Sequence, residues 1–372
     1  MMQIRRRKAR VIKIGKVAIG GDNPIAIQSM TKTETSDIEK TVRQIKDLES
    51  AGCEIVRLAV KDNQDARAIR KIKEKIGLPI VADIHFDWRL AIDAIDNGAD
   101  KIRLNPGNIY RKEELREIAT AAKLNNIPIR IGVNSGSLIK VKESLTCSGR
   151  QEKSKVKSIS GAMIKSALDY IKILEGFGFY DIVVSLKASN ILDTIHAYCK
   201  IAGLCDYPLH LGVTATGPPY TGTIKSAIAI GTLLLEGIGD TIRVSLTDEP
   251  VHEVAAAKII LETLKIRRFG PEIISCPTCG RCEVDLIKIV KELETKLSTI
   301  DYPLPAGRQG LSTTPPKVAI MGCVVNGPGE AREADIGIAF GKKQGLLFKK
   351  GKAVRKVSFN NCVDILLKEI NS

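Results

Sequence analysis

The stretch IVRLAVKDNQDARAIRKIKEKIGLPIVADIH, residues 55–85, decides the fold class. It begins with a short apolar run, Ile55–Val60, and ends with a second apolar run at residues 80–85. Between them, residues 66–76 carry apolar side chains at helical spacing. Two Ile- and Val-rich runs joined by one amphipathic helix are typical of a βαβ unit, whose strands are parallel and buried on both faces.

The same alternation recurs along the first two thirds of the chain. Eight apolar runs occupy residues 25–30, 55–60, 80–85, 101–105, 128–134, 181–187, 208–214 and 241–246. Helical periodicity follows at residues 36–50, 66–76, 90–97, 112–125, 160–176, 190–203, 224–237 and 251–264. This pattern predicts an α/β fold, a (β/α)8 TIM barrel. An open, doubly wound sheet is the alternative, but no GxGxxG or Walker A sequence follows any of the runs.

The pattern changes after Arg267. Helices are expected at residues 284–297 and 363–370, and strands at 317–321, 336–339 and 354–358. We therefore expect a barrel domain over residues 1–267 and a smaller α+β domain over residues 268–372. Residues 301–316 contain four prolines and two glycines, which predicts an exposed, mobile insert.

Composition narrows the class of protein. The chain has 372 residues, 44% of them hydrophobic, enough for two cores, and no apolar run of the ~18 residues that a membrane helix needs. No apolar secretion segment follows the basic start, so we expect a cytoplasmic protein without membrane contact. The net charge of +15 would suit nucleic acid, but only 4% of residues are aromatic, which leaves little for base stacking. A small anionic substrate or an acidic partner would suit the same charge.

Polar side chains gather where the predicted strands end, which is where a TIM barrel builds its active site. Five different strands contribute a cation each: Arg57, Arg103, Arg130, Lys187 and Arg243. Asp83, Asn105 and Asn134 are expected at the same end. Because buried cations are costly without a counter-charge, the set predicts a phosphorylated small molecule held by arginine. The alternative is that some of these cations lie low in the barrel and pair with acidic residues.

The second domain contains two cysteine motifs. Residues 274–283 hold three thiols at successive CxxC spacings, Cys276, Cys279 and Cys282. Cys323 follows a predicted strand and precedes a Gly-Pro-Gly sequence, which predicts a turn that aims Glu330 back toward the thiol. Four cysteines could close a structural zinc site. The CxxCxxC spacing and the Cys-Pro dipeptide favour an iron–sulfur cluster instead.

Seven motifs together resemble the 4-hydroxy-3-methylbut-2-enyl diphosphate synthase family, in its two-domain bacterial form. They are IQSMTKT (27–33), DIH (83–85), RLNPGN (103–108), GVNSGS (132–137), LGVTATG (211–217), SCPTCGR (275–281) and MGCVVNGPGEA (321–331). The resemblance covers nearly the whole chain, and the last two motifs are the most specific. The length leaves no room for the extra domain of plant-type members.

The resemblance implies an iron–sulfur oxidoreductase of isoprenoid biosynthesis. It would reductively open and dehydrate 2-C-methyl-D-erythritol 2,4-cyclodiphosphate, with two electrons from flavodoxin or ferredoxin. A [4Fe-4S] cluster would be held by Cys276, Cys279, Cys323 and Glu330, the last being catalytic because a carboxylate is an exchangeable ligand. The barrel would bind the cyclic diphosphate, and a homodimer would place one chain's cluster domain over the other chain's barrel mouth.

Three features depart from the family pattern, namely Cys282, the insert at residues 301–316, and Phe340 where glycine is expected. We expect Cys282 not to be a ligand. Two rival hypotheses remain. One is a basic, zinc-containing nucleic-acid-binding module, and the other is a barrel aldolase or pterin-type transferase with a structural zinc.

Overall fold

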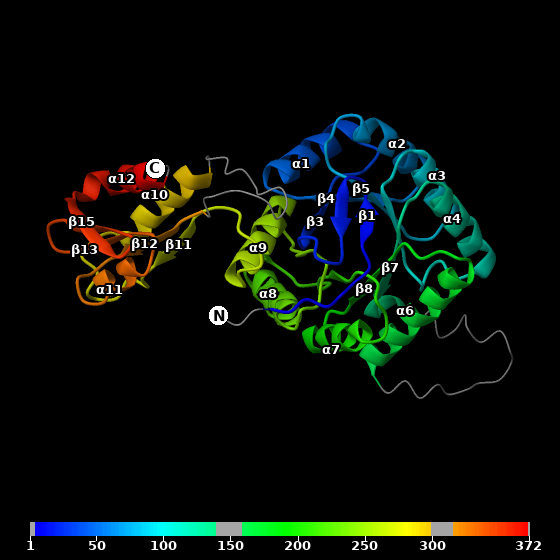
Figure 1. Cartoon of the computed structure of the whole chain (residues 1–372). Coiled ribbons are helices and arrows are strands. Elements are labelled where there is room, and N and C mark those ends of the chain that lie inside the picture. Colours follow the sequence, from blue (N-terminus) through cyan, green and yellow to red (C-terminus); the bar gives the residue numbers. More distant parts are fainter. Residues whose placement is uncertain (1–3, 139–157, 299–314, 371–372) are drawn as a thin grey trace. The chain divides into compact units, whose positions relative to one another are not determined.

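The computed structural model describes residues 4–138, 158–298 and 315–370. The chain divides into two compact units, Met1–Ile266 and Arg267–Ser372, which are described separately (Figure 1). This division lies one residue from the boundary expected after residue 267. The predicted insert at 301–316 falls almost entirely outside the described residues.

The first unit is a closed barrel of eight parallel strands. They are β3 (Ala26–Met30), β4 (Ile55–Val60), β5 (Ile80–Ile84), β6 (Lys101–Leu104), β7 (Ile129–Asn134), β8 (Ile182–Lys187), β9 (His210–Leu211) and β10 (Thr241–Ile242). The order is β8-β7-β6-β5-β4-β3-β10-β9, and a parallel bridge between Val184 and Leu209 joins its two ends. The predicted TIM barrel is therefore confirmed.

Helices alternate with these strands and surround the barrel (Figure 1). They are α1 (Ile38–Ser50), α2 (Asn63–Lys73), α3 (Arg89–Asp96), α4 (Lys112–Leu124), α6 (Ile159–Gly176), α7 (Ile191–Ala202), α8 (Pro219–Leu235) and α9 (Pro250–Thr263). Helix α1 shows why these segments form helices. The Asp37 side chain accepts from the Lys40 backbone N–H and caps the amino end, and Val42, Ile45 and Leu48 are buried on one face. Gly52 follows the helix at φ +91°, a conformation that favours glycine.

The last two strands are shorter than the sequence predicts. Strands β9 and β10 have two residues each, whereas apolar runs extend over 208–214 and 241–246. Val213, Val244 and Leu246 are nevertheless buried beyond the strand ends. The apolar pattern here reports burial at the barrel mouth rather than strand pairing.

A short hairpin that the sequence did not reveal closes the other end of the barrel. Strand β1 (Ile12–Ile14) pairs antiparallel with β2 (Val17–Ile19). The buried side chains of Ile12, Ile14 and Ile19 pack against residues near the amino ends of four barrel strands: Ala26, Ile55, Val81 and Val183. The carboxyl end is left for the polar residues.

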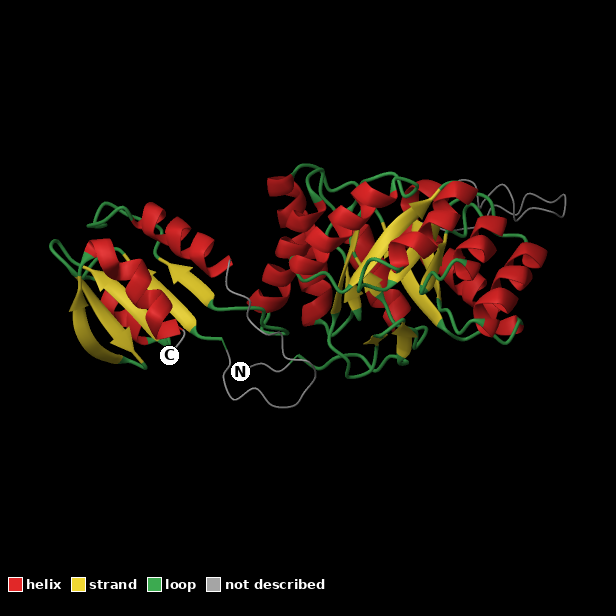
Figure 2. Cartoon of the chain, turned by 90° about the horizontal axis from the view of Figure 1, so that it is seen from above, coloured by secondary structure: helices red, strands yellow, loops and turns green. Residues whose placement is uncertain are grey.

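The second unit is a five-stranded sheet with helices on both faces (Figures 1 and 2). Its strands, in spatial order, are β11 (Glu272–Ser275), β12 (Lys317–Met321), β13 (Ile336–Phe340), β14 (Gly345–Lys349) and β15 (Lys352–Val357). The first three strands pair in parallel, and β14 pairs antiparallel with both β13 and β15. Helices α10 (Leu286–Ser298) and α12 (Cys362–Ile370) bury one face, and α11 (Gly327–Arg332) packs on the other. Strands β11 and β14 were not predicted. No helix in the described ranges is long and apolar enough to cross a bilayer.

Candidate active site

A polar pocket lies at the carboxyl end of the barrel. Its lining residues are Arg57, Asp83, His85, Arg103, Arg130, Asn134, Ser185, Lys187, Val213, Thr214, Arg243 and Ser245. The five predicted cations, Asp83 and Asn134 are thus brought together. Asn105 is not among the lining residues: its Oδ1 accepts from the Gly107 N–H at 3.1 Å in the loop after β6, and from Ser137 Oγ at 3.2 Å in the segment after β7.

Asp83 is the one carboxylate among these lining residues, and three basic side chains share it. Its oxygens lie 3.1 Å from Arg103 Nη1, 3.6 Å from Arg57 Nε and 3.2 Å from His85 Nε2. Burial alone would raise the pKa of this carboxyl, but the charges of Arg57 and Arg103 hold its pKa well below the ordinary value. Burial lowers the pKa of Arg57 to about 9 despite Asp83. Asp83 therefore stays ionised and orients two guanidinium groups.

Two further cations have no carboxylate within ion-pair distance among the described residues. Arg130 is 1% exposed, and its Nε and Nη1 are buried without a hydrogen-bond partner. The Lys187 Nζ lies 3.3 Å from His210 Nε2. Burial and the nearby charge of Arg57 hold the pKa of Arg130 well below its ordinary value. Burial and the nearby charge of Arg130 do the same to the pKa of Lys187. A bound anion would supply the missing counter-charge.

Two glycines make room for these cations. A Cβ at Gly132 would lie 2.3 Å from Arg103 Nε, and one at Gly212 would lie 2.6 Å from Lys187 Nζ. The Gly132 carbonyl also accepts from Arg103 Nη2 at 2.9 Å. Any side chain at either position would push a cation out of its place in the pocket.

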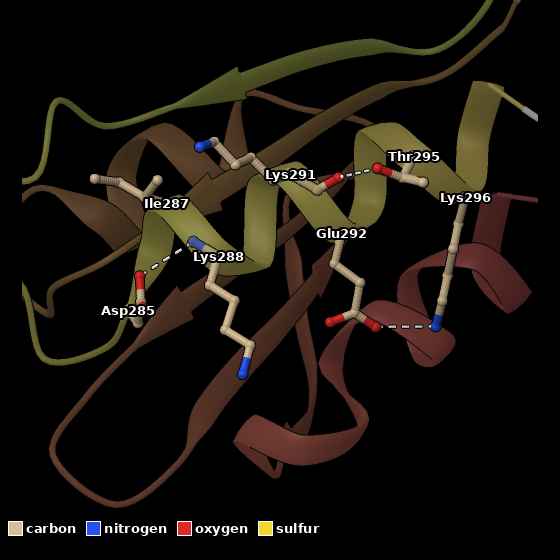
Figure 3. A pocket seen from close by; sticks show the side chains of 7 residues that line it. All are labelled: Asp285, Ile287, Lys288, Lys291, Glu292, Thr295 and Lys296. Atoms are coloured by element: carbon tan, nitrogen blue, oxygen red, sulfur yellow. Dashed lines mark hydrogen bonds and ion pairs between the residues drawn. The ribbon is translucent and has the colours of Figure 1, made fainter.

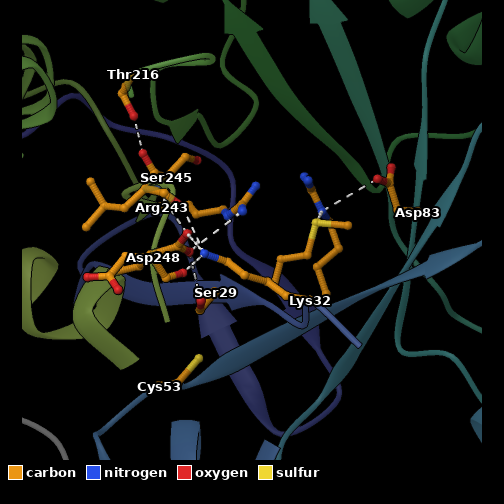
Figure 4. A network of polar contacts seen from close by, with 12 residues as sticks. Ser29, Lys32, Cys53, Asp83, Thr216, Arg243, Ser245 and Asp248 are labelled. Carbon is orange, nitrogen blue, oxygen red and sulfur yellow. Dashed lines mark hydrogen bonds and ion pairs between the residues drawn. The ribbon is translucent and has the colours of Figure 1, made fainter. Parts of the chain in front are cut away.

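Sequence reasoning missed Glu253, a second buried carboxylate behind the pocket. It comes from α9 and is 2% exposed. Its Oε2 accepts from Ser29 Oγ at 3.1 Å and lies 3.7 Å from Arg243 Nη2, while Oε1 accepts from the Leu246 N–H at 3.0 Å. Figure 4 shows Ser29, Lys32 and Arg243 converging in this polar network.

A signal for Glu253 was present in the sequence. It stands on the buried face of α9 with Ala257, Ile260 and Leu261, at helical spacing. A charged residue on the apolar face of a barrel helix needs a partner in the interior.

In the second unit, two of the predicted thiols follow neighbouring strands. Cys276 comes directly after β11, and Cys323 comes two residues after β12, with which β11 is paired in parallel. The Gly322 N–H donates to Cys276 Sγ at 3.3 Å. Hydrogen bonds from the backbone N–H groups of Asn326 and Val325 lower the pKa of the Cys323 thiol. Cys323 is buried, Cys276 half-buried and Cys279 exposed.

The Gly-Pro-Gly turn predicted before Glu330 is wrong. These residues begin helix α11, in which the N–H of Glu330 donates to the Asn326 carbonyl at 3.2 Å. Proline suits the first helical turn because its φ is preset and its missing N–H would have no helical partner there. Glu330 is exposed in that first turn.

Cys282 lies close to Cys276, and both side chains pack against the same core cluster. A Cβ at Gly322 would lie 2.3 Å from Cys282 Sγ and 3.5 Å from Cys276 Sγ, so both sulfurs lie beside Gly322. The Cys282 thiol donates to the Val284 carbonyl at 3.2 Å, and its side chain packs against the core.

The donor set of this unit suits an iron–sulfur cluster in chemical type. Three thiols and a carboxylate are available, and two of the thiols follow adjacent strand ends. Within the described ranges, no three His, Cys, Asp or Glu side chains are gathered closely enough to hold a metal ion. Cys279 and Glu330 are the two donors that lie exposed.

A hollow along α10 offers no comparable chemistry (Figure 3). Its volume is about 610 Å³, and it is lined by Asp285, Ile287, Lys288, Lys291, Glu292, Thr295 and Lys296. Glu292 pairs with Lys296 at 3.0 Å, and Thr295 Oγ1 donates to the Lys291 carbonyl at 2.8 Å. The hollow therefore lies along an exposed helix surface, and the carboxylate–lysine pair among its lining residues is formed within the helix.

The barrel pocket and the thiol-bearing unit define a two-unit TIM-barrel enzyme whose pocket is lined by cations. The model of the GcpE TIM-barrel domain matches residues 9–258, and that of the GcpE protein C-terminal domain matches residues 272–372. The chain therefore belongs to the GcpE family.

Curated relatives match over almost their whole length. The chain is 54% identical over 369 residues to a protein of Caldanaerobacter subterraneus subsp. tengcongensis, covering 98% of this chain and 97% of the relative. It is 55% identical over 361 residues to a protein of Caldicellulosiruptor saccharolyticus, covering 97% of this chain and 98% of the relative. Both relatives are named 4-hydroxy-3-methylbut-2-en-1-yl diphosphate synthase (flavodoxin). The predicted family resemblance is confirmed.

Proposed function

We propose that the barrel pocket binds a cyclic diphosphate and that the second unit carries the iron–sulfur cluster through which it is reduced. The reaction is the reductive ring opening and dehydration of 2-C-methyl-D-erythritol 2,4-cyclodiphosphate to 4-hydroxy-3-methylbut-2-enyl diphosphate. It consumes two electrons and two protons and releases one water. The names of the relatives support this oxidoreductase activity in isoprenoid biosynthesis.

The observation that carries the proposal is the excess of buried positive charge at the barrel mouth. Five cations and one carboxylate line the pocket, and Arg130 and Lys187 have no carboxylate partner among the described residues. A diphosphate supplies several anionic oxygens in one small molecule, and arginine binds such oxygens in pairs. Asn134 and Ser185 line the same pocket and can donate hydrogen bonds to the substrate.

The chain's own residues would bind, orient and neutralise the substrate. Asp83 fixes Arg57 and Arg103, and Glu253 fixes Arg243, so three guanidinium groups are positioned before the ligand arrives. Arg130 and Lys187 provide charge deep in the pocket. As a carbon–oxygen bond breaks and negative charge grows on the leaving phosphate oxygen, this preorganised charge stabilises it.

The second unit would hold a [4Fe-4S] cluster through Cys276, Cys279, Cys323 and Glu330. When bound, that cluster supplies the electrons for the reduction. The hydrogen-bonded surroundings of Cys323 favour its thiolate, the form that binds iron. The exposed carboxylate of Glu330 is the most exchangeable of the four donors.

The partners follow from the same proposal. The relatives' names give flavodoxin as electron donor, and ferredoxin would serve the same role. We propose a homodimer, in which one chain's cluster unit serves the other chain's barrel. The cytoplasm suits a chain whose described cysteines are all free.

Metal analysis of anaerobically purified protein tests the proposal against its zinc-containing rivals. We expect iron and sulfide in equal amounts, a visible absorption band, and turnover of the cyclodiphosphate with a chemical reductant. Zinc without iron or sulfide, in protein reconstituted under reducing conditions, would refute it.

Glu330→Ala tests the carboxylate. The variant should keep part of the cluster and lose most turnover, whereas Glu333→Ala, an exposed carboxylate at the end of the same helix, should keep both. Full activity of Glu330→Ala would refute its role.

A further inference from the structure

We propose that an exposed apolar and basic surface beside Cys323 docks a small acidic redox protein that delivers electrons to the second unit. The surface consists of Val324, Val325, Lys342 and Lys343, and we refer to it as the valine–lysine surface. The inference rests on the proposed function, since it identifies where that reaction's electrons enter.

The apolar part is a pair of consecutive exposed valines. Val324 is 61% exposed and Val325 is 62% exposed, and they directly follow the predicted cluster ligand Cys323. Neither packs into the core of the unit, although most of β12, which ends at Met321, is buried. Exposed apolar residues that adjoin a functional group, rather than scattered singly, indicate a contact surface.

The basic part comes from the connection between β13 and β14, which lies against Val324. The N–H of Gly341 donates to the Gln344 carbonyl at 3.0 Å and closes a tight turn. A Cβ at Gly341 would lie 3.1 Å from Val324 Cγ1, so this turn and the valine are in contact. Lys342 and Lys343 stand exposed in the turn.

The two lysines are available to a partner's carboxylates. Neither forms an ion pair with another described residue, unlike Lys349 farther along the same hairpin, which lies 2.7 Å from Glu369. Two exposed cations, without an ion pair among the described residues and next to an apolar centre, favour an acidic protein over a neutral one.

The composition of this surface suits a transient redox complex. Such complexes bury less than about 1,200 Å² in total. They combine an apolar centre with a charged rim, and the charges mainly speed association. An electron donor must approach the cluster closely, and this surface begins at one of its predicted ligands. The main competing occupant is the barrel of a second copy of the chain.

The double variant Lys342→Glu/Lys343→Glu tests the basic part in the full-length holoenzyme. Turnover is measured with reduced flavodoxin and, separately, with dithionite, which needs no docking surface. We expect the KM for flavodoxin to rise about 10-fold or more in this variant. In the wild type the KM should increase with salt concentration, and in the variant this increase should disappear. Dithionite-driven turnover and the absorption of the cluster should be unchanged.

Two further variants sharpen the test. Lys288→Glu/Lys291→Glu makes the same change of charge on the exposed surface of α10 and should leave the KM for flavodoxin near its wild-type value. Val325→Ser should raise that KM while keeping its dependence on salt, because it removes only apolar contact.

The outcomes separate the possibilities. An unchanged KM for flavodoxin in Lys342→Glu/Lys343→Glu would overturn the docking proposal. Equal losses with flavodoxin and dithionite, at unchanged cluster absorption, would also overturn it and assign the surface to a contact with a barrel. If the wild-type chain turns over with neither reductant, the proposed function fails instead. Docking is then judged by the Kd for flavodoxin at low salt, which must rise in the double variant.

Discussion

The guanidinium of Arg243 and the carboxylate of Glu253 lie 3.7 Å apart, between the end of β10 and the first turns of α9. Both groups are largely buried, and the same carboxylate accepts from Ser29 at the end of β3. Glu253 therefore joins two neighbouring strand ends through one side chain. It fixes the direction in which Arg243 points into the pocket.

Glu253→Gln should raise the KM for the cyclodiphosphate about 10-fold, with a smaller effect on kcat. The amide keeps the shape but loses the charge that orients Arg243, and the free energy of unfolding should fall by about 1–3 kcal/mol. Steady-state kinetics and denaturant titration measure the two effects. Glu249→Gln, at the exposed start of the same helix, is the matched control. A variant with lower stability and unchanged KM would show that Glu253 is only structural.

Gly132→Ala should weaken substrate binding by displacing Arg103. The added methyl would start 2.3 Å from Arg103 Nε, which is closer than real side chains approach. Gly136→Ala is the matched control, because a Cβ there has no atom within 4 Å. Calorimetric titration with the cyclodiphosphate compares the two. Equal affinities would contradict the predicted crowding.

Arg130→Met should stabilise the ligand-free protein. It should also abolish the increase in thermal stability that the cyclodiphosphate gives to the wild type. Removing a buried, unpaired cation from among four others relieves repulsion and desolvation, and we expect a gain of about 1–2 kcal/mol in the free energy of unfolding. Thermal unfolding with and without the cyclodiphosphate tests both parts. Arg67→Met, on an exposed face of α2, should change neither quantity. A destabilised Arg130→Met variant would mean that the cation is paired in the free protein.

Stability should fall below pH 6.5 because of His210. Burial is the main cause that holds the pKa of His210 well below the ordinary value. The nearby positive charge of Lys187 adds to this, and Arg130, Lys101 and Arg57 act in the same direction. The unfolded chain therefore binds a proton near pH 6.5 that the folded chain does not, so the free energy of unfolding decreases as pH falls. The slope from one such group approaches about 1.4 kcal/mol per pH unit.

His210→Asn tests this contribution. Denaturant titrations at pH 5, 6, 7 and 8 should show a flatter slope in the variant than in the wild type. His196→Asn replaces an exposed histidine of α7 and should leave the slope unchanged. Identical slopes for wild type and His210→Asn would contradict the assignment.

Cys282→Ser and Cys276→Ser should differ in iron content. The Cys282 thiol donates a hydrogen bond to the Val284 carbonyl, so its replacement should leave iron and activity largely intact. Cys276→Ser should lose most of both. Loss of iron from Cys282→Ser alone would mean that the wrong cysteines were assigned.

The repeated apolar runs were enough to predict the barrel. Along residues 55–60 and 80–84, burial on both faces of a parallel sheet leaves an apolar signal that only Arg57 and Asp83 interrupt. The same signal misled at residues 208–214 and 241–246, where buried loops are as apolar as strands. The β1–β2 hairpin was missed because its strands have only three residues each, too short for a clear period.

The sequence by itself determined the fold class and the family, and it nominated the cations of the pocket, because parallel strands must bring their carboxyl ends to one edge. Only the tertiary structure decided how those cations are paired. Asp83 forms ion pairs with Arg57 and Arg103, and Glu253 forms one with Arg243. Arg130 and Lys187 have no carboxylate partner among the described residues. Such pairing depends on distances of a few ångströms between side chains from different strands and helices, because Coulomb energy falls with distance and rises with burial.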